Sequence, residues 1–219
     1  MCGRYTEDFR SDSIANYHQR LIDFANAMEG ESRFNIAPTT SATIQRWGDG
    51  EPEFASCRWG LIPSWAKAIG KPLINARSET AHEKPTFRGS FKSKRCLVFA
   101  SGYFEWIKTE DGKQPFYIQN DDATPMLFYG LWSRWRGPKT IDSYTILTTD
   151  AADDVSSIHD RMPCIADLAL KLDAWLDPEF TNVEQLQSLL RPTEGLRATR
   201  VSKYVNSVRN QGAAYVEVV

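Results

Sequence analysis

The chain begins Met1-Cys2-Gly3, which brings a cysteine next to the initiator methionine. Cysteine is small enough for that methionine to be removed, and removal would leave an amine and a thiol on adjacent carbons. The α-amine has a reference pKa of about 7.7–8.0 and the thiol one of about 8.5, so both groups can titrate near neutrality. Such an aminothiol can condense with an aldehyde to a Schiff base and then close a thiazolidine ring. From Met1 and Cys2 alone, an unprocessed terminus is the simpler interpretation.

Two internal segments carry groups that could transfer protons. Glu105 is the one carboxylate in the aromatic stretch 103–106, where it must either be paired or keep a raised pKa. His159 is followed by Asp160 and Arg161 in a loop that ends at a proline. A single histidine usually has a structural role. Together with a nucleophile and a buried acid, however, it makes an acid–base site a reasonable hypothesis.

Cations are concentrated locally although the chain of 219 residues has a net charge of −2. Asn75 and Arg77 put an amide and a cation beside the end of an apolar strand. Residues 84–96 contain five cations and no acid, and residues 191–209 contain five cations and one acid. Such runs are most often solvated faces, but in an acidic protein they are equally consistent with a phosphate-binding groove.

The remaining cysteines, Cys57, Cys96 and Cys164, lie far apart and form no C-x-x-C pair. We therefore expect buried thiols, with no zinc site, other metal, cofactor or disulfide. No apolar run approaches the roughly 18–20 residues that span a bilayer, and the first residues lack the apolar core of a secretory signal. These features predict a cytoplasmic protein with no membrane partner.

The pattern along the chain predicts a single α+β domain over residues 1–219, with a mixed or antiparallel β-sheet, a barrel-like core and helices around it. Apolar residues at helical spacing predict a helix over 12–28. Further helices are expected at 76–82, 151–157, 166–176 and 182–190. Strands are expected at 42–47, 53–59, 95–107, 115–119, 126–134, 143–149 and 214–218.

Seven segments of the chain, in this order, resemble those of the SOS response-associated peptidase (SRAP) family of abasic-site-processing proteins. They are Met1-Cys2-Gly3-Arg4-Tyr5, Arg33-Phe34-Asn35-Ile36-Ala37-Pro38-Thr39, Arg58-Trp59-Gly60-Leu61-Ile62-Pro63-Ser64-Trp65, Ile74-Asn75-Ala76-Arg77-Ser78-Glu79-Thr80, Gly102-Tyr103-Phe104-Glu105-Trp106, Ile158-His159-Asp160-Arg161-Met162-Pro163 and Val205-Asn206-Ser207. The last segment is expected to be mainly structural.

The resemblance implies catalytic roles for four residues. Cys2, exposed as the terminus by autocatalytic loss of Met1, would crosslink the ring-opened sugar aldehyde of an abasic site in single-stranded DNA as a thiazolidine. Asn75 would hold the new terminus. Glu105 would assist removal of Met1 and proton transfer, and His159 would act as acid or base on the sugar hydroxyl.

The resemblance also implies a DNA-binding surface. Arg4, Arg77 and Arg161 would bind phosphates beside the lesion. Pro38 and Trp65 would meet the neighbouring bases, although the sequence is equally compatible with Trp65 in the core. The protein would act as a monomer at the nucleoid during DNA damage, with replication-fork proteins as further partners.

Two other functions remain open at this point. The first is a cysteine peptidase that cleaves other proteins, with Cys2 as nucleophile and His159 as base. The second is a module that binds single-stranded or gapped DNA without any chemistry. The first would need a groove for an extended peptide, which the sequence does not identify.

Overall fold

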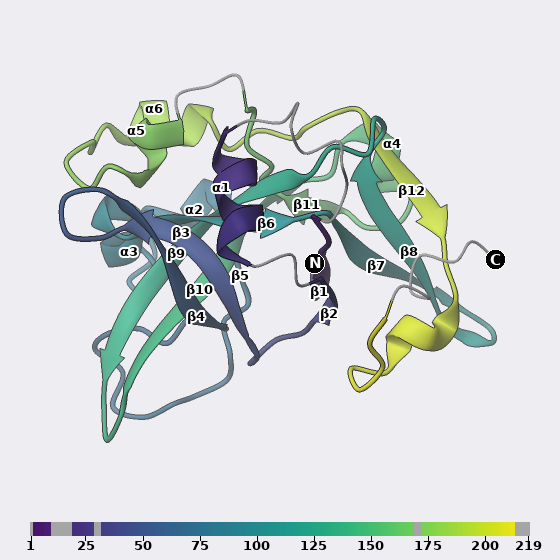
Figure 1. Ribbon diagram of the computed structural model, residues 1–219, viewed down its shortest axis with the longest axis horizontal. Coiled ribbons are helices and arrows are strands. Elements are labelled where there is room, and N and C mark those ends of the chain that lie inside the picture. Colours follow the sequence, from purple (N-terminus) through teal and green to yellow (C-terminus); the bar gives the residue numbers. More distant parts are fainter. Residues whose placement is uncertain (1, 10–18, 29–31, 169–171, 213–219) are drawn as a thin grey trace.

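The computed structural model describes residues 2–9, 19–28, 32–168 and 172–212, and it contains two β-sheets with short helices around them (Figure 1). One sheet has the order β12 (Leu196–Arg200), β8 (Gly112–Asn120), β7 (Gly102–Thr109), β1 (Arg4–Glu7) and β2 (Arg33–Ile36). Every pairing in this sheet is antiparallel.

The second sheet closes on itself. Its order is β11 (Arg161–Pro163), β10 (Thr140–Asp150), β4 (Pro52–Trp59), β3 (Ser41–Trp47), β6 (Arg95–Ala100) and β9 (Met126–Arg136). Because β9 also pairs with β10, the strands β10, β4, β3, β6 and β9 form a barrel. The pairings of β10 with β4 and with β5 (Asn75–Arg77) are parallel, so the sheet is mixed. The predicted α+β fold with a barrel-like core is confirmed.

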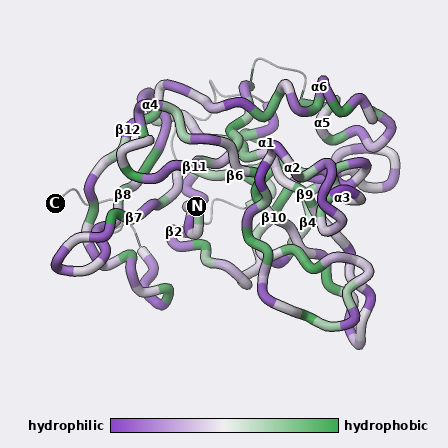
Figure 2. The backbone as a smooth tube through the Cα atoms, turned by 180° about the vertical axis from the view of Figure 1, so that it is seen from behind, coloured by the Kyte–Doolittle hydropathy of each residue, from purple (hydrophilic) through white to green (hydrophobic). Residues whose placement is uncertain are grey.

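Alternating side chains divide the apolar residues of the barrel into two clusters. On β6, Val98 belongs to a cluster with Cys2 and Tyr5, whereas Leu97 and Phe99 belong to the other, as expected where successive residues of a strand point to opposite faces. Hydropathy accordingly changes from residue to residue along most elements (Figure 2).

Helices cover the second of these clusters. Its members include Phe24 of α1, Phe91 of α3 and Trp175 of α5. The helices are α1 (Gln19–Ala27), α2 (Ser78–Ala81), α3 (Arg88–Ser93), α4 (Asp153–Ser156), α5 (Leu172–Leu176) and α6 (Val183–Ser188), followed by the 3-10 helix η2 (Lys203–Asn206). Within the described ranges, no helix has the length and apolar character needed to cross a membrane.

Most predicted elements are present, with one clear error. Strands predicted at 42–47, 53–59, 115–119, 126–134 and 143–149 correspond to β3, β4, β8, β9 and β10. The prediction of one strand over 95–107 is wrong, because the chain passes from the barrel to the other sheet at Ser101. There Ser101 N–H donates to Thr6 O (2.8 Å), and Gly102 leaves room for Tyr117, whose ring atoms lie 2.4 Å from where a Cβ would stand.

The helices predicted over 76–82, 151–157 and 182–190 are shorter than expected, because α2, α4 and α6 cover only parts of these ranges. Of the helix predicted over 12–28 the structure describes α1, and of the one predicted over 166–176 it describes α5 and non-helical residues 166–168. The strand predicted over 214–218 and residues 12–18 lie outside the described residues. The short strands β1, β2, β5, β11 and β12, of three to five residues each, were missed, because runs of that length show too few alternations to be recognised.

One residue of the basic stretch 84–96 is not on the surface. Arg95 is 1% exposed, and its guanidinium donates to the backbone carbonyls of five residues, Phe91, Lys92, Trp175, Asp177 and Phe180. It therefore ties α3 to the segment around α5 and cannot contribute to a phosphate groove.

Strand β1 carries a buried acid, Glu7, at the end opposite Cys2. Both of its carboxylate oxygens lack a hydrogen-bond partner among the described residues, and the nearest cation is the half-buried Arg33, 3.5 Å away. Burial raises the pKa of Glu7 to about 8, although the charge of Arg33 opposes this shift. The folded protein consequently holds a proton that an exposed glutamate releases near pH 4.3.

We predict that Glu7→Gln gains stability relative to the wild type as the pH rises from 5 to 8. In this window the unfolded chain has lost the proton that the folded chain keeps, so the wild type loses about 1.4 kcal/mol per pH unit from this group. Urea unfolding of both proteins at pH 5 and pH 8 measures the change. An equal difference between the two proteins at both values would contradict a raised pKa.

Candidate active site

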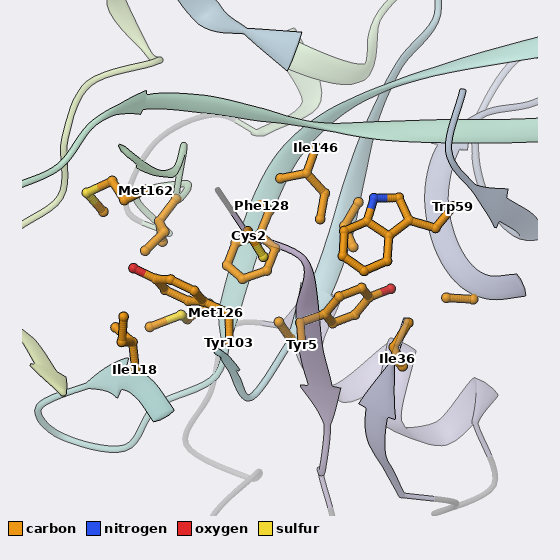
Figure 3. Close-up of a cluster of buried hydrophobic side chains, with 14 of the residues drawn as sticks. Cys2, Tyr5, Ile36, Trp59, Tyr103, Ile118, Met126, Phe128, Ile146 and Met162 are labelled. Atoms are coloured by element: carbon orange, nitrogen blue, oxygen red, sulfur yellow. The ribbon is translucent and has the colours of Figure 1, made fainter. Parts of the chain in front are cut away.

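Cys2 lies two residues before the first residue of β1. It is completely buried, in a cluster that includes Tyr103, Phe128 and Met162 (Figure 3). Its Sγ lies 3.7 Å from Arg4 O, to which it donates a weak hydrogen bond. Because β1 pairs with β7 on one side and β2 on the other, the backbone that follows Cys2 is fixed by two neighbouring strands.

Asn75 fixes Cys2 from the side of the barrel. Its Nδ2 donates to the carbonyl oxygen of Cys2 (2.8 Å), and its backbone pairs with Ile146 of β10. The Oδ1 atom of Asn75 is buried, with no hydrogen-bond partner among the described residues. A buried amide oxygen in this state can accept a hydrogen bond from a group that arrives later, such as an amine.

Glu105 interacts electrostatically with Cys2. It is 3% exposed on β7, and burial raises the pKa of its carboxyl group, while the charge of His159 lowers it. Burial and then the negative charge of Glu105 raise the pKa of the Cys2 thiol. The thiol is therefore neutral near pH 7, and it needs a base before it can attack.

His159 is held by the loop in front of β11. Its Nδ1 lies 2.9 Å from the backbone N–H of Arg161 and 2.8 Å from Oδ1 of Asp160. It accepts from the N–H when the ring is neutral, and it can donate to the carboxylate only when Nδ1 carries a proton. Either way, the contacts of Nδ1 fix the orientation of the imidazole ring.

Two of the three predicted phosphate-binding arginines have partners within the protein. Arg161 is 7% exposed, and its guanidinium donates to both oxygens of Glu79 (2.8 and 2.9 Å) and to Asp150 (2.6 Å). It thereby positions the loop of His159. Arg77 is exposed at the end of β5, two residues after Asn75, and so lies on the same face of that strand.

Arg4 joins β1 to the C-terminal part of the chain. Its guanidinium donates to Asn35 Oδ1 (2.9 Å), Val205 O (2.6 Å) and Asn206 O (3.3 Å). Asn206 Oδ1 in turn accepts from the indole N–H of Trp106 (2.7 Å). The segment 205–207 is therefore a structural support of the strand that carries Cys2, in agreement with the sequence prediction.

A groove of about 430 Å³ opens beside Gly3 and Arg4. Pro38 also lines this part of it, and Trp106 and Lys113 line another. Among the described residues, no aspartate or glutamate lines this groove. The sequence did not single out Lys113, because nothing in the hairpin of β7 and β8 distinguishes it from other exposed lysines.

Trp65 is not a core residue, because 66% of its surface is exposed. The turn that presents it is fixed by Ala66 N–H to Pro63 O (3.0 Å) and by the indole N–H of Trp135 to Ala66 O (2.7 Å). An exposed indole on an anchored turn can stack on a planar ligand.

Within the described part of the chain, no group of three or more His, Cys, Asp or Glu side chains is arranged to hold a metal ion. The chemistry available at Cys2 comes from a thiol, a buried carboxyl group, an imidazole and an amide.

The family model described as SOS response associated peptidase (SRAP) matches residues 1–208. The chain belongs to this family. It is 36% identical over 225 residues to the abasic site processing protein YoqW of Bacillus subtilis, with 99% of each chain covered. It is 31% identical over 226 residues to the abasic site processing protein YedK of Escherichia coli, with both chains fully covered.

A protein from an animal and two solved structures are also similar to this chain. The abasic site processing protein HMCES of Gallus gallus is 36% identical over 180 residues, which cover 70% of this chain and 54% of that protein. Crystal structures of proteins from Bacteroides thetaiotaomicron (TM-score 0.77, 23% identity, 98% and 99% coverage) and Bordetella bronchiseptica (TM-score 0.70, 26% identity, 92% and 100% coverage) share the fold.

Proposed function

We propose that this SRAP protein removes its own Met1 and uses the aminothiol of Cys2 to form a thiazolidine crosslink with abasic sites in single-stranded DNA. The observation that carries the proposal is the placement of Cys2, held by Asn75 and lying within the electrostatic influence of the buried Glu105. The relatives YoqW and YedK are abasic site processing proteins, which supports the choice of substrate.

The reaction has two stages. Hydrolysis of the Met1–Cys2 bond consumes one water, releases methionine and frees the α-amine of Cys2. In the second stage, this amine adds to the aldehyde carbon of the ring-opened sugar and the resulting hydroxyl leaves as water. Sγ then adds to the iminium carbon, and the thiol proton ends on a base. One water is released overall in this stage.

Glu105 suits the proton transfers of the second stage. A carboxyl group with a raised pKa remains protonated closer to neutral pH, so it can donate to the leaving hydroxyl. The carboxylate that results can then accept the proton of the neutral Cys2 thiol. One buried group thus serves as acid and then as base, which fits a site with a single buried carboxylate beside the nucleophile.

His159 and Asn75 complete the site. The anchored imidazole is suited to take a proton from the sugar hydroxyl during ring opening, through Nε2. The unpartnered Oδ1 of Asn75 is suited to accept a hydrogen bond from the new amine, so that one side chain holds both the carbonyl and the nitrogen of Cys2.

DNA reaches Cys2, in this proposal, through the groove of Gly3, Pro38 and Lys113. Exposed Arg77 binds a phosphate beside the lesion, and the indole of Trp65 stacks on a base, a contact typically worth about 1–3 kcal/mol. Arg4 and Arg161 can contribute further phosphate contacts only if the phosphate displaces part of their present hydrogen bonds.

Denaturing electrophoresis with abasic single-stranded DNA tests the proposal. The wild type should give a heat-stable shifted band, and Cys2→Ala should give none while still binding DNA. Cys2→Ser can form a Schiff base but no thiazolidine, so its band should require reduction by borohydride. A tag that blocks the terminus should act like Cys2→Ala, and stable crosslinking by the blocked protein would refute the proposal.

Glu105→Gln and His159→Ala should each slow crosslinking by about 10²–10⁴-fold without abolishing it, as is typical for loss of general acid–base assistance. The Glu105→Gln variant should also retain more Met1, and its crosslinking rate should depend less on pH than that of the wild type, because it lacks the carboxyl group whose pKa is raised by burial. Single-turnover rates of fully processed proteins between pH 5 and pH 8 measure both effects. Rates equal to the wild type would give both residues purely structural roles.

Arg77→Ala should weaken binding to every sequence and make the dependence of log K on log salt less steep by about 0.7, the contribution of one phosphate on a single strand. Arg161→Ala is expected to flatten the slope to the same extent only if its phosphate contact forms. That variant should also lose stability, because Glu79 loses its partner. If the DNA affinity and the salt slope of Arg77→Ala equal those of the wild type, Arg77 does not contact a phosphate of the bound DNA.

A peptidase that cleaves other proteins is less well supported. The groove beside Gly3 and Arg4 is also lined by Asn206 of the C-terminal segment, and the relatives YoqW and YedK are named for abasic sites and not for protein substrates. A DNA-binding module without chemistry is also less well supported, because it does not require a buried carboxyl group close enough to Cys2 to influence its thiol.

A further inference from the structure

A second, polar cavity lies beside Trp65 on the side of α3. It has a volume of about 250 Å³. The residues that line it include five with a side-chain hydroxyl, Ser64, Thr86, Ser90, Ser93 and Ser133, and one cationic residue, Lys94. Among the described residues, no aspartate or glutamate lines it. We call it the hydroxyl pocket.

Both walls of the hydroxyl pocket are fixed to the barrel. On one side, Ile62 N–H donates to Ser143 Oγ (2.9 Å), which holds the turn that presents Trp65. On the other, Lys94 N–H donates to Ser90 O (2.7 Å) at the end of α3, and Lys94 O accepts from Trp132 N–H (2.8 Å). The cavity therefore exists without a ligand, and binding requires little rearrangement of the backbone.

The charges around the pocket favour an anion. Lys94 is half-buried, with its Nζ 5.4 Å from the centre of the Trp132 ring. Burial lowers the pKa of Lys94, and the nearby Arg134 and Arg136 lower it further, while Asp142 alone opposes them. Since Asp142 is already engaged by Arg134 and Arg46, the cations are in excess here.

We infer that the hydroxyl pocket binds a backbone phosphate of the DNA strand, at a nucleotide beyond the base that stacks on Trp65. Hydroxyl and ammonium donors match the acceptor oxygens of a phosphodiester, and such contacts position a strand without reading its sequence. The inference extends the proposed function, because it assumes that DNA is the ligand of this surface.

Lys94→Ala tests the inference, with Lys92→Ala as the matched control. Lys92 carries the same charge two residues earlier, at the exposed end of α3, and does not line the hydroxyl pocket. Abasic oligonucleotides are shortened by one nucleotide at a time from the 5′ or the 3′ end, and their non-covalent affinities are measured with Cys2→Ala protein. If Lys94→Ala is unstable, Lys94→Met is measured in its place. Methionine removes the charge but keeps an apolar side chain packed against Trp132.

We expect Lys94→Ala to weaken binding of the full-length oligonucleotide about 3- to 10-fold at low salt and to reduce the salt slope by about 0.7. The difference in affinity between Lys94→Ala and the protein with Lys94 should disappear when the oligonucleotide is shortened from one end past the nucleotide whose phosphate occupies the hydroxyl pocket. Lys92→Ala should show a smaller loss with no such dependence on length.

Equal effects of Lys94→Ala and Lys92→Ala, or a loss that is the same at every oligonucleotide length, would overturn the inference. Inorganic phosphate is tested alone. If phosphate binding depends on Lys94 but DNA binding shows no dependence on oligonucleotide length, the pocket binds a free anion. This result also contradicts the inference.

If the wild type binds DNA with the predicted length dependence but forms no crosslink, the proposed chemistry fails and the phosphate site stands. If it binds no DNA, both fail.

Discussion

The hydrogen bond from Asn75 Nδ2 to the carbonyl of Cys2 is the contact on which the proposed chemistry depends. It crosses from the barrel, where β5 lies against β10, to the sheet that contains β1. A residue so close to a chain terminus would ordinarily fray. Here it is buried, because strand pairing fixes the backbone that follows it and Asn75 fixes its carbonyl.

Burial of this terminus has an electrostatic consequence. It removes Cys2 and Glu105 from water together, and both groups then favour their neutral forms. A neutral thiol is protected from unwanted reactions, and in the proposed mechanism the carboxyl group of Glu105 gives up a proton when the imine forms. The same desolvation that stabilises the core thus sets the order of the proton transfers in the proposed mechanism.

The sequence predicted β3, β4, β9 and β10 of the barrel and β8 of the other sheet, since these strands are long enough to show alternation. It also predicted the family from short motifs. It did not predict that 95–107 divides between two sheets. That break depends on contacts of Ser101 with Thr6 and on the close approach of Tyr117 to Gly102, both of which join distant segments.

For the site, residue types alone indicated Cys2, Glu105 and His159 as a chemical group, but they could not reveal the internal partners of the arginines. The basic run 84–96 illustrates the difficulty, because neighbouring residues of one short stretch have opposite environments. Arg95 is buried against backbone carbonyls, whereas Lys94 lines a polar cavity. The packing of α3 on the barrel decides which cation is buried. The order of charged residues in the sequence does not predict this packing.

The most direct test of the account is the intact mass of the purified protein after reaction with abasic single-stranded DNA, followed by mapping of the modified peptide. The account predicts a mass equal to protein plus DNA, less Met1 and less one water, with the DNA attached at the N-terminal Cys2. An adduct that retains Met1, or that maps to an internal lysine, would contradict it.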